Sequence, residues 1–424
     1  MPQPSAYQGR QAWTVAFLLA AMMLVNFLDK VVTGLVAVPM MKELQLTPAE
    51  FGLVGGSLNW LFSISAIAGG FLANRHATRW LLLGMGAFWA LVQLPMLFAT
   101  SLWTLVACRV LLGVGEGPAS PVATHALYKW FPDERRSLPV ALLHSGSAMG
   151  LLLAGLMIPW VSARYGWRSN FAVLAGLGLL WCLAWAWLGR EGALGDTRAQ
   201  GAPGKPERVP YRHLLGNPTV LANYFCHFAA NWSLALTLTW VPAYLESGLG
   251  VSAMNAGRLF GLFVLVTMPL SLTLAWLSQR LLAAGHSSRV ARGLFVSLCL
   301  LASGVLSIVL LADLPLAVRM ACMTLSGGLA LVMYSVGPAM LGEVTPTRQR
   351  GGILAIGNAC SSLAGLGAPI LTGLLVQRAG GLDGLGYAHG FAVSGVLLVV
   401  AALVGCTWLH PQKARQRLGQ LCAG

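Results

Sequence analysis

Long apolar runs separated by short polar stretches repeat along the whole chain. Windows of about 20 apolar residues, the length that crosses a bilayer as a helix, occur twelve times. The predicted spans cover residues 12–40, 51–73, 80–99, 102–125, 138–161, 171–189, 218–245, 256–278, 293–312, 314–341, 353–377 and 388–409. The pattern predicts an all-α polytopic membrane protein with twelve transmembrane helices.

One segment rich in Gly, Pro and charge interrupts this rhythm after the sixth span. It predicts an N-terminal six-helix bundle over 1–189, a cytoplasmic linker over 190–217 and a C-terminal bundle with a short cytoplasmic tail over 218–424. "FPDERRS" after span four has a counterpart in "VTPTRQRG" after span ten. Such a repeat predicts two pseudo-symmetric bundles, with a site near the middle of the membrane where they meet.

Composition and charge agree with a lipid environment. The chain of 424 residues is 57% hydrophobic and 9% charged, with a formal charge of +14. With both termini placed in the cytoplasm, 19 Lys and Arg lie on the cytoplasmic side and 4 on the other. The positive-inside rule explains this asymmetry, so the basic charge needs no nucleic-acid partner. We therefore expect a multi-pass protein of a cell membrane, most simply a bacterial inner membrane.

Four charges, namely Asp29, Lys30, Arg109 and Glu116, lie deep within predicted spans. Each costs a few kcal/mol at a helix centre, so such residues usually face a bundle interior or a watery cavity. Arg109 and Glu116 are seven residues apart, on one helix face and roughly 10 Å apart along its axis. This spacing suits a cation that holds a ligand beside a separate carboxylate that handles protons. The alternative is two structural ion pairs between helices, Asp29 with Arg109 and Lys30 with Glu116.

These residues belong to motifs that resemble the major facilitator superfamily and, within it, the anion:cation symporter family of organic-anion transporters. The similarity extends over essentially the whole chain. It is carried by "NFLDK" (26–30), "RVLLGVGEGPASP" (109–121), "LTWVPAYL" (238–245), "WFPDERRS" (130–137), "GWRSNF" (166–171) and "GNACSSLAG" (357–365).

The resemblance implies uptake of an organic anion driven by a cation, usually a proton. It implies that Asp29 and Glu116 handle protons and that Lys30 and Arg109 bind substrate. It also implies that Asn358 contacts the substrate from the second half.

Departures from the family pattern concern the expected pocket. Phe27 and Phe62 stand where tyrosine is common, Ser147 where glutamine is frequent in sugar-acid carriers, and His144 where asparagine is usual. These changes remove hydrogen-bonding groups, which favours a less hydroxylated or aromatic carboxylate over a sugar acid.

Two further side chains are candidates for the site. Trp240, within the matched seventh-helix motif, could stack on a ligand, although aromatic belts at membrane interfaces are the common alternative. His144 could relay protons because histidine titrates near neutral pH.

The combined prediction is a secondary active transporter rather than an enzyme. We expect proton-coupled symport of a small carboxylate by alternating access, by a monomer that needs no metal or other cofactor. Proton-driven efflux is the alternative. It is weakened because "GSAMGLLLAG" (146–155) lacks the proline of the antiporter motif. A non-transporting membrane sensor on the same fold is a further alternative, and it would need a large soluble extension.

Overall fold

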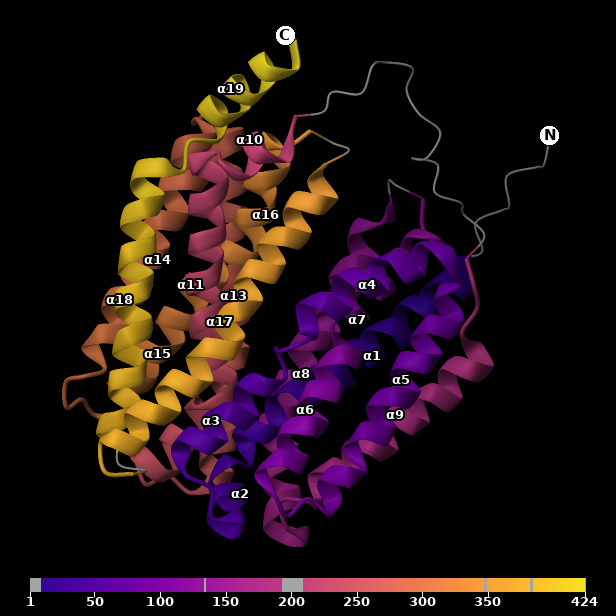
Figure 1. The fold of residues 1–424 in the computed structure, drawn as a ribbon, viewed down its shortest axis with the longest axis vertical. Helices are drawn as coiled ribbons and strands as arrows, with labels where there is room; N and C mark the ends of the chain where they lie inside the picture. Colours follow the sequence, from indigo (N-terminus) through magenta and orange to yellow (C-terminus); the bar gives the residue numbers. More distant parts are fainter. Residues whose placement is uncertain (1–8, 133–134, 193–208, 347–348, 382–383, 424) are drawn as a thin grey trace. The chain divides into compact units, whose positions relative to one another are not determined.

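The structure is a computed structural model that describes residues 9–132, 135–192, 209–346, 349–381 and 384–423. These residues form helices joined by short connections, and no strand occurs in the described ranges (Figure 1). The chain divides into two compact units. Unit 1 comprises 1–46, 53–203 and 251–261, and unit 2 comprises 47–52, 204–250 and 262–424. Each unit is described below by itself.

Unit 1 is built mainly from the first nine helices. Their bounds are α1 Gly9–Leu35, α2 Ala37–Leu44, α3 Pro48–Ser57, α4 Phe62–Arg75, α5 Thr78–Gln93, α6 Leu102–Glu116, α7 Ala119–Tyr128, α8 Ser137–Tyr165 and α9 Ser169–Leu188. The first residues of α3 belong to unit 2.

Glycines on α8 let it approach α1 closely. A Cβ atom added to Gly146 or Gly150 would lie 2.1 Å from the carbonyl oxygen of Ala20 or 2.3 Å from that of Leu24. Small residues at such a crossing allow backbone contact in lipid, where no hydrophobic effect drives helices together. The glycines of the "GSAMGLLLAG" stretch therefore have a packing role in this unit.

Unit 2 contains the remaining helices. Their bounds are α10 Tyr211–Leu215, α11 Pro218–Thr239, α12 Val241–Ala243, the π-helical turn η4 Tyr244–Gly248, α13 Ala253–Ala283, the π-helical turn η5 Arg289–Leu294, α14 Phe295–Val309, α15 Leu316–Leu331, α16 Met333–Val344, α17 Arg350–Arg378, α18 Gly384–Trp408 and α19 Pro411–Ala423. The first turns of α13 belong to unit 1.

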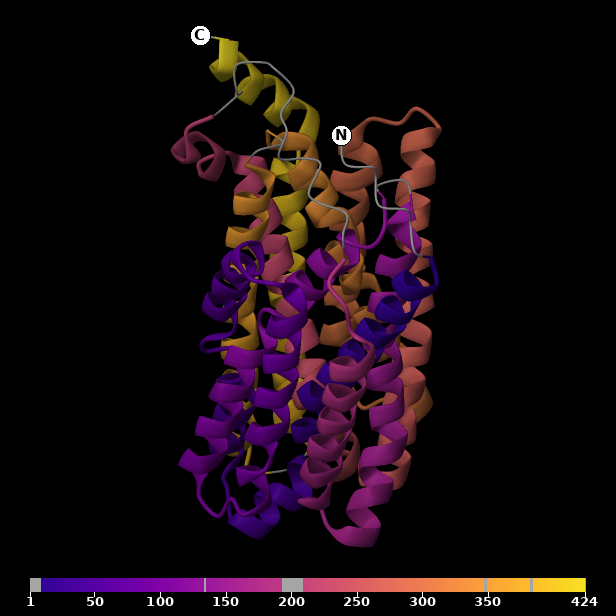
Figure 2. The same ribbon diagram turned by 90° about the vertical axis from the view of Figure 1, so that its right-hand side faces the viewer.

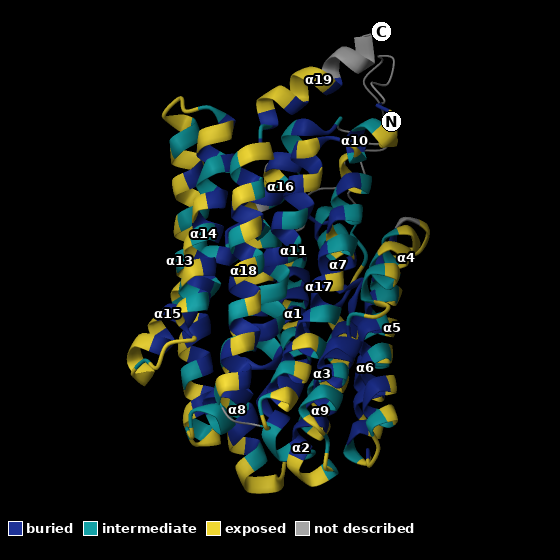
Figure 3. Ribbon diagram, turned by 60° about the vertical axis from the view of Figure 1, so that its left-hand side comes forward, coloured by how far each residue is buried: buried dark blue, intermediate teal, exposed yellow. Residues whose placement is uncertain are grey.

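The interior of unit 2 is organised around α11. Figure 3 shows α11 largely buried, whereas α13 has exposed residues along its length. At one end of the unit, α10 and α19 lie together (Figures 1 and 2) and share an apolar cluster that includes Leu214 and Leu418. Exposed apolar side chains such as Leu272 and Trp276 on α13 fit a lipid-facing surface.

Ten helical segments of the described chain are long and apolar enough to cross a membrane. The two predicted spans without a counterpart among them are 102–125 and 218–245. The first is interrupted at Gly117–Pro118, between α6 and α7, and carries Arg109 and Glu116. The second is interrupted at Trp240, just before Pro242, and carries several polar residues. The break leaves α6 with 15 residues, which is short for a membrane crossing, and polar residues make both segments less apolar.

The linker predicted over 190–217 falls largely outside the described residues. Its described end contains the short helix α10. Val209 in this stretch exchanges two backbone hydrogen bonds with the side chain of Gln349.

Candidate functional site

Helix α6 carries two of the four charges, Arg109 and Glu116. It begins at Leu102, and the hydroxyl of the preceding Ser101 caps the helix by accepting a hydrogen bond from the Thr104 amide. Arg109 and Glu116 lie on its buried face, with 4% and 1% of their surfaces exposed. The sequence-predicted spacing thus places both charges inside unit 1.

Glycines allow α6 to lie directly against its neighbours. A Cβ added to Gly113 would lie 1.9 Å from the carbonyl oxygen of Leu58, and one added to Gly117 would lie 2.3 Å from that of Phe62. No side chain fits at either position without a backbone shift. The glycines around Glu116 therefore bring α6 into contact with the α3–α4 backbone.

The Asp29 carboxylate has a neutral partner. Asp29 is 1% exposed, and the Gln93 amide of α5 donates to its Oδ1 over 2.8 Å. Arg109 Nη1 donates to the backbone carbonyl of Asp29 over 3.2 Å and not to its carboxylate. Gln93, itself 2% exposed, was missed by sequence reasoning. Its only signal is one amide near the end of an otherwise apolar span.

Glu116 and Asn26 are buried with unused hydrogen-bonding capacity. Neither Glu116 oxygen and neither amide atom of Asn26 makes a hydrogen bond of good geometry within the described residues, although the Asn26 amide lies close enough to act on the Glu116 carboxylate. Glu116 still interacts electrostatically with Lys30 and Arg109. Asn26 is fully buried, and it was quoted in the first motif but not predicted as a site residue.

Lys30 lies between two aromatic rings. Its Nζ is 4.4 Å from the ring centroid of Phe27 and 5.1 Å from that of Phe62. A cation over an aromatic face is attracted by the ring quadrupole, by about 0.5–2 kcal/mol. The two phenylalanines that replace the family's tyrosines therefore hold the ammonium group.

The described part of unit 1 contains no ion pair among Asp29, Lys30, Arg109 and Glu116 within 4.0 Å. The hypothesis of two structural interhelical ion pairs does not describe this geometry. Instead, two carboxylates and two cations interact electrostatically inside one unit, and the groups that contact Asp29, Lys30 and Arg109 directly are neutral.

The other predicted residues of unit 1 lie on α8. Ser147 is 8% exposed, and its hydroxyl has no hydrogen-bond partner among the described groups. His144 is exposed, and within the described residues no hydrogen bond or ion pair joins it to the four charges. Its proton-relay role stays a prediction.

Trp240 and Asn358 belong to unit 2. Trp240 is fully buried, its Nε1 donates to the Pro369 carbonyl over 3.0 Å, and its ring packs edge-on against Phe51 and Tyr387. This packing leaves no free ring face for a ligand in the present structure. Asn358 is exposed, and its backbone carbonyl accepts hydrogen bonds from two serines of α17. Its side chain is therefore open to a partner.

Carboxylates at the ends of unit 1 contrast with those in its middle because they are fully paired. Glu191 accepts from Lys129 Nζ over 2.6 Å and from the backbone amides of Thr78 and Arg79 at the start of α5. Partial burial raises the pKa of Glu191. The hydrogen bonds from Lys129, Arg79 and Thr78 outweigh this effect, so its pKa lies below the usual range.

Glu43, near the end of α2, is paired in the same way. It accepts a hydrogen bond of 2.6 Å from Trp167 Nε1 and forms an ion pair with Arg168. These two hydrogen bonds hold the pKa of Glu43 below its ordinary value.

No group of three or more His, Cys, Asp or Glu side chains in the described ranges could hold a metal ion. The arrangement in unit 1 is suited to binding an anion and exchanging protons.

Comparison with known proteins gives an independent view. A family model described as Major Facilitator Superfamily matches residues 18–334. The chain is 28% identical over 382 residues to the sodium-dependent phosphate transport protein 1 of Arabidopsis thaliana chloroplasts, covering 86% of this chain and 74% of that protein. It is 25% identical to the D-galactonate transporter of Escherichia coli O6:H1, covering 96% of this chain and 98% of that protein.

Among solved structures, a bacterial homologue of the human lysosomal transporter Spinster superimposes with a TM-score of 0.78 at 18% identity, covering 98% of this chain and 99% of that one. At this identity the likeness concerns the fold alone.

Proposed function

Because the chain belongs to the Major Facilitator Superfamily and is a multi-pass membrane transporter rather than an enzyme, we propose that it takes up a small organic anion together with protons. Asp29 and Glu116 carry the protons, and Lys30 and Arg109 bind the anion. The same proposal places the protein as a monomer in a bacterial inner membrane with both termini in the cytoplasm. The distribution of Lys and Arg supports that orientation.

One observation carries the proposal: two carboxylates and two cations lie inside unit 1 without a direct ion pair. Their formal charges sum to zero when all four are ionised. A bound monoanion would leave a net negative charge in a lipid-embedded bundle, which is costly. One proton on Glu116 or Asp29 restores neutrality. Charge balance thus couples each negative charge of the substrate to one proton.

The two cations have capacity left for a carboxylate. Arg109 donates to a backbone carbonyl, and its Nε has no partner among the described residues. Lys30 lies against two aromatic rings, which leave the N–H donors of its ammonium group available for hydrogen bonds. A guanidinium presents a planar fork to a carboxylate, and an ammonium adds a point charge beside it.

Transport then follows from competition for the same positive charges. Protonation of the carboxylates frees Arg109 and Lys30 for the substrate, and the neutral loaded carrier can change its side of access. Loss of the protons on the cytoplasmic side restores the negative charges near the cations. These charges repel the bound anion, and the substrate leaves. The relatives' names, which include phosphate and galactonate, support an anionic cargo.

The test uses purified protein and begins with a thermal-shift screen of galactonate, glucuronate, benzoate and inorganic phosphate. Glu116→Gln, a mimic of the protonated acid, is then reconstituted in vesicles with the anion that binds. We expect this variant to keep binding and exchange while losing accumulation driven by external acid. Glu43→Gln, which alters a carboxylate outside the membrane, is the control and should accumulate normally. Undiminished uphill uptake by Glu116→Gln would refute the coupling role, and acid-driven export would favour efflux.

A further inference from the structure

The Gln93 amide donates a hydrogen bond to the Asp29 carboxylate, next to the arginine that we propose binds the anion. Gln93 comes from α5, Asp29 from α1 and Arg109 from α6, and all three are at most 4% exposed. Arg109 donates to the backbone carbonyl of Asp29 and interacts electrostatically with its carboxylate, so the guanidinium and the carboxylate are neighbours. The carboxylate is instead hydrogen-bonded to the Gln93 amide over 2.8 Å and does not pair with Arg109.

We infer that Gln93 is a positioning residue that keeps Arg109 available for substrate. This inference rests on the proposed function. Without the amide, the carboxylate of Asp29 would lose its neutral donor in a place where an unpaired charge is costly. Arg109 is the strongest nearby donor, and pairing with it would occupy the group that binds the anion. Because Asp29 has a neutral partner, Asp29 and Arg109 can be neighbours without forming an ion pair.

The test is a double-mutant cycle read out by anion binding. Gln93→Met keeps the side-chain length but removes the donor, and we expect it to weaken anion binding about tenfold, the equivalent of one hydrogen bond to a charged group. The variant should raise the KM of uptake while leaving the maximal rate within about twofold of the wild type. In an Asp29→Asn background no carboxylate competes for Arg109, so the same substitution should change binding little.

Equal weakening in both backgrounds would overturn the inference, because Gln93 would then act without Asp29. If Gln93→Met does not fold, Gln93→Asn withdraws the amide by one methylene and should give the same loss in the wild-type background alone. A wild-type protein that binds none of the four anions would instead count against the proposed function itself.

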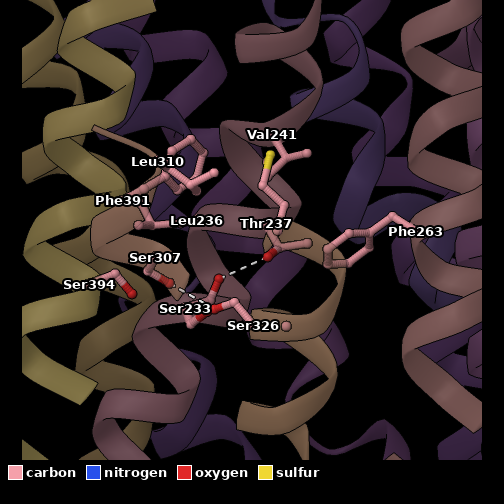
Figure 4. Close-up of a pocket in the computed structure, with 12 residues that line it drawn as sticks. Ser233, Leu236, Thr237, Val241, Phe263, Ser307, Leu310, Ser326, Phe391 and Ser394 are labelled. Carbon is pink, nitrogen blue, oxygen red and sulfur yellow. Dashed lines mark hydrogen bonds between the residues drawn. The ribbon is translucent and has the colours of Figure 1, made fainter. Parts of the chain in front are cut away.

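A second feature lies inside unit 2 and is independent of the charges. Five hydroxyl side chains from four helices line one cavity: Ser233 and Thr237 on α11, Ser307 on α14, Ser326 on α15 and Ser394 on α18. Figure 4 shows the serines grouped at one end of the cavity and the Phe263 ring at the other. The cavity measures about 20 Å³, counted as space open to the centre of a water-sized sphere.

Three of these hydroxyls differ in their hydrogen bonding. Ser307 and Ser326 share a hydrogen bond of 2.8 Å, and Ser326 is also linked to Ser303. Ser394 is 2% exposed, and its hydroxyl has no partner among the described residues. A buried hydroxyl without a partner costs about 1–3 kcal/mol.

We propose that this cavity binds one internal water molecule, which links Ser394 to the Ser307–Ser326 pair. A water needs about 10–15 Å³ on the same measure and two to four polar partners. The cavity meets both conditions. A metal cation fits it less well, because the lining is neutral and the described interior of unit 2 has no buried carboxylate. The water would join α18 to α14 and α15 through hydrogen bonds.

The sign of a stability change tests this site. If water binds there, Ser394→Ala removes one of its partners and lowers the melting temperature by a few degrees. If the hydroxyl is truly without a partner, the same change raises the melting temperature or leaves it unchanged. Ser307→Ala, which removes an observed hydrogen bond, is the control and should lower it.

A structure at a resolution that reveals waters supplies the second measurement. We expect density at hydrogen-bond distance from Ser394 Oγ, and its absence among other visible buried waters would overturn the proposal. A higher melting temperature in sodium chloride than in choline chloride at equal ionic strength, lost in Ser394→Ala, would assign the site to a cation and overturn it as well.

Discussion

The interiors of the two units differ in the charges that they bury. Unit 1 buries Asp29, Arg109 and Glu116, and its carboxylate and amide groups are only partly hydrogen-bonded. In the described part of unit 2, the one buried formal charge is Arg319, which lies near an end of α15 and not in its middle. The remaining buried polar groups there are neutral. Buried charges are expensive in lipid, so their concentration in unit 1 supports the proposal that this unit handles the ions.

The two buried arginines, Arg109 and Arg319, test this difference between the units most directly. Arg319 donates to the Tyr244 hydroxyl over 2.6 Å and to backbone carbonyls and Asp313, so its donors are used within the protein. Arg109→Ala should abolish anion binding, because the main cation of the site is lost. Arg319→Ala should keep binding while lowering the melting temperature, because Tyr244 loses its partner.

Binding by thermal shift and melting temperature without ligand, measured on both variants, separate the two roles. If Arg109→Ala still binds the anion, Arg109 is structural and the contrast between the units fails. If Arg319→Ala abolishes binding in a folded protein, unit 2 handles the charge as well.

The sequence predicted the architecture better than the contacts. Apolar periodicity and length are enough to identify helices in lipid, and the cost of charge is enough to identify Asp29, Lys30, Arg109 and Glu116 as a set. The set does lie within one unit. The breaks at Gly117 and Trp240 were not located, because helix-breaking residues also occur within continuous membrane helices.

The partners of the charges could not be predicted in the same way. Gln93 lies 64 residues from Asp29 along the chain, and their contact depends on the rotation of two helices about their axes. One uncharged amide in an apolar run costs little and gives little signal. The hydrogen bond from Trp240 to the Pro369 carbonyl and the ring contact of Trp240 with Tyr387 likewise depend on helix packing, which no local motif specifies.

A smaller effect is expected at the ends of unit 1, where carboxylates are paired. Glu191→Gln should cost about 1–2 kcal/mol, because the carboxylate caps the start of α5 and pairs with Lys129. The pKa of Glu191 is lowered in the folded protein, so its stabilisation is present above the unfolded pKa and is lost as pH falls through the folded one.

The melting-temperature difference between wild type and Glu191→Gln should therefore be largest near neutral pH and shrink in acid. Glu343→Gln in unit 2 is a matched control. Glu343 accepts hydrogen bonds from the side chains of Arg292 and Ser288, whereas Glu191 also accepts from the backbone amides that begin a helix, so a smaller loss of stability is expected for Glu343→Gln. A difference for Glu191→Gln that grows in acid would contradict the assignment.

The smallest effect compares one serine from each interior. Ser147 in unit 1 has a buried hydroxyl without a partner among the described residues, whereas Ser307 in unit 2 is hydrogen-bonded to Ser326. Ser307→Ala should cost about 0.5–1.5 kcal/mol, whereas Ser147→Ala should cost close to nothing in the free protein. If Ser147 contacts the substrate, its removal should instead weaken anion binding several-fold. Chemical or thermal unfolding with and without the anion separates the effect on stability from the effect on anion binding. Equal losses of stability with unchanged binding would show that the hydroxyl of Ser147 serves the fold, as that of Ser307 does. The difference between the two units would then rest on the buried charges of unit 1 alone.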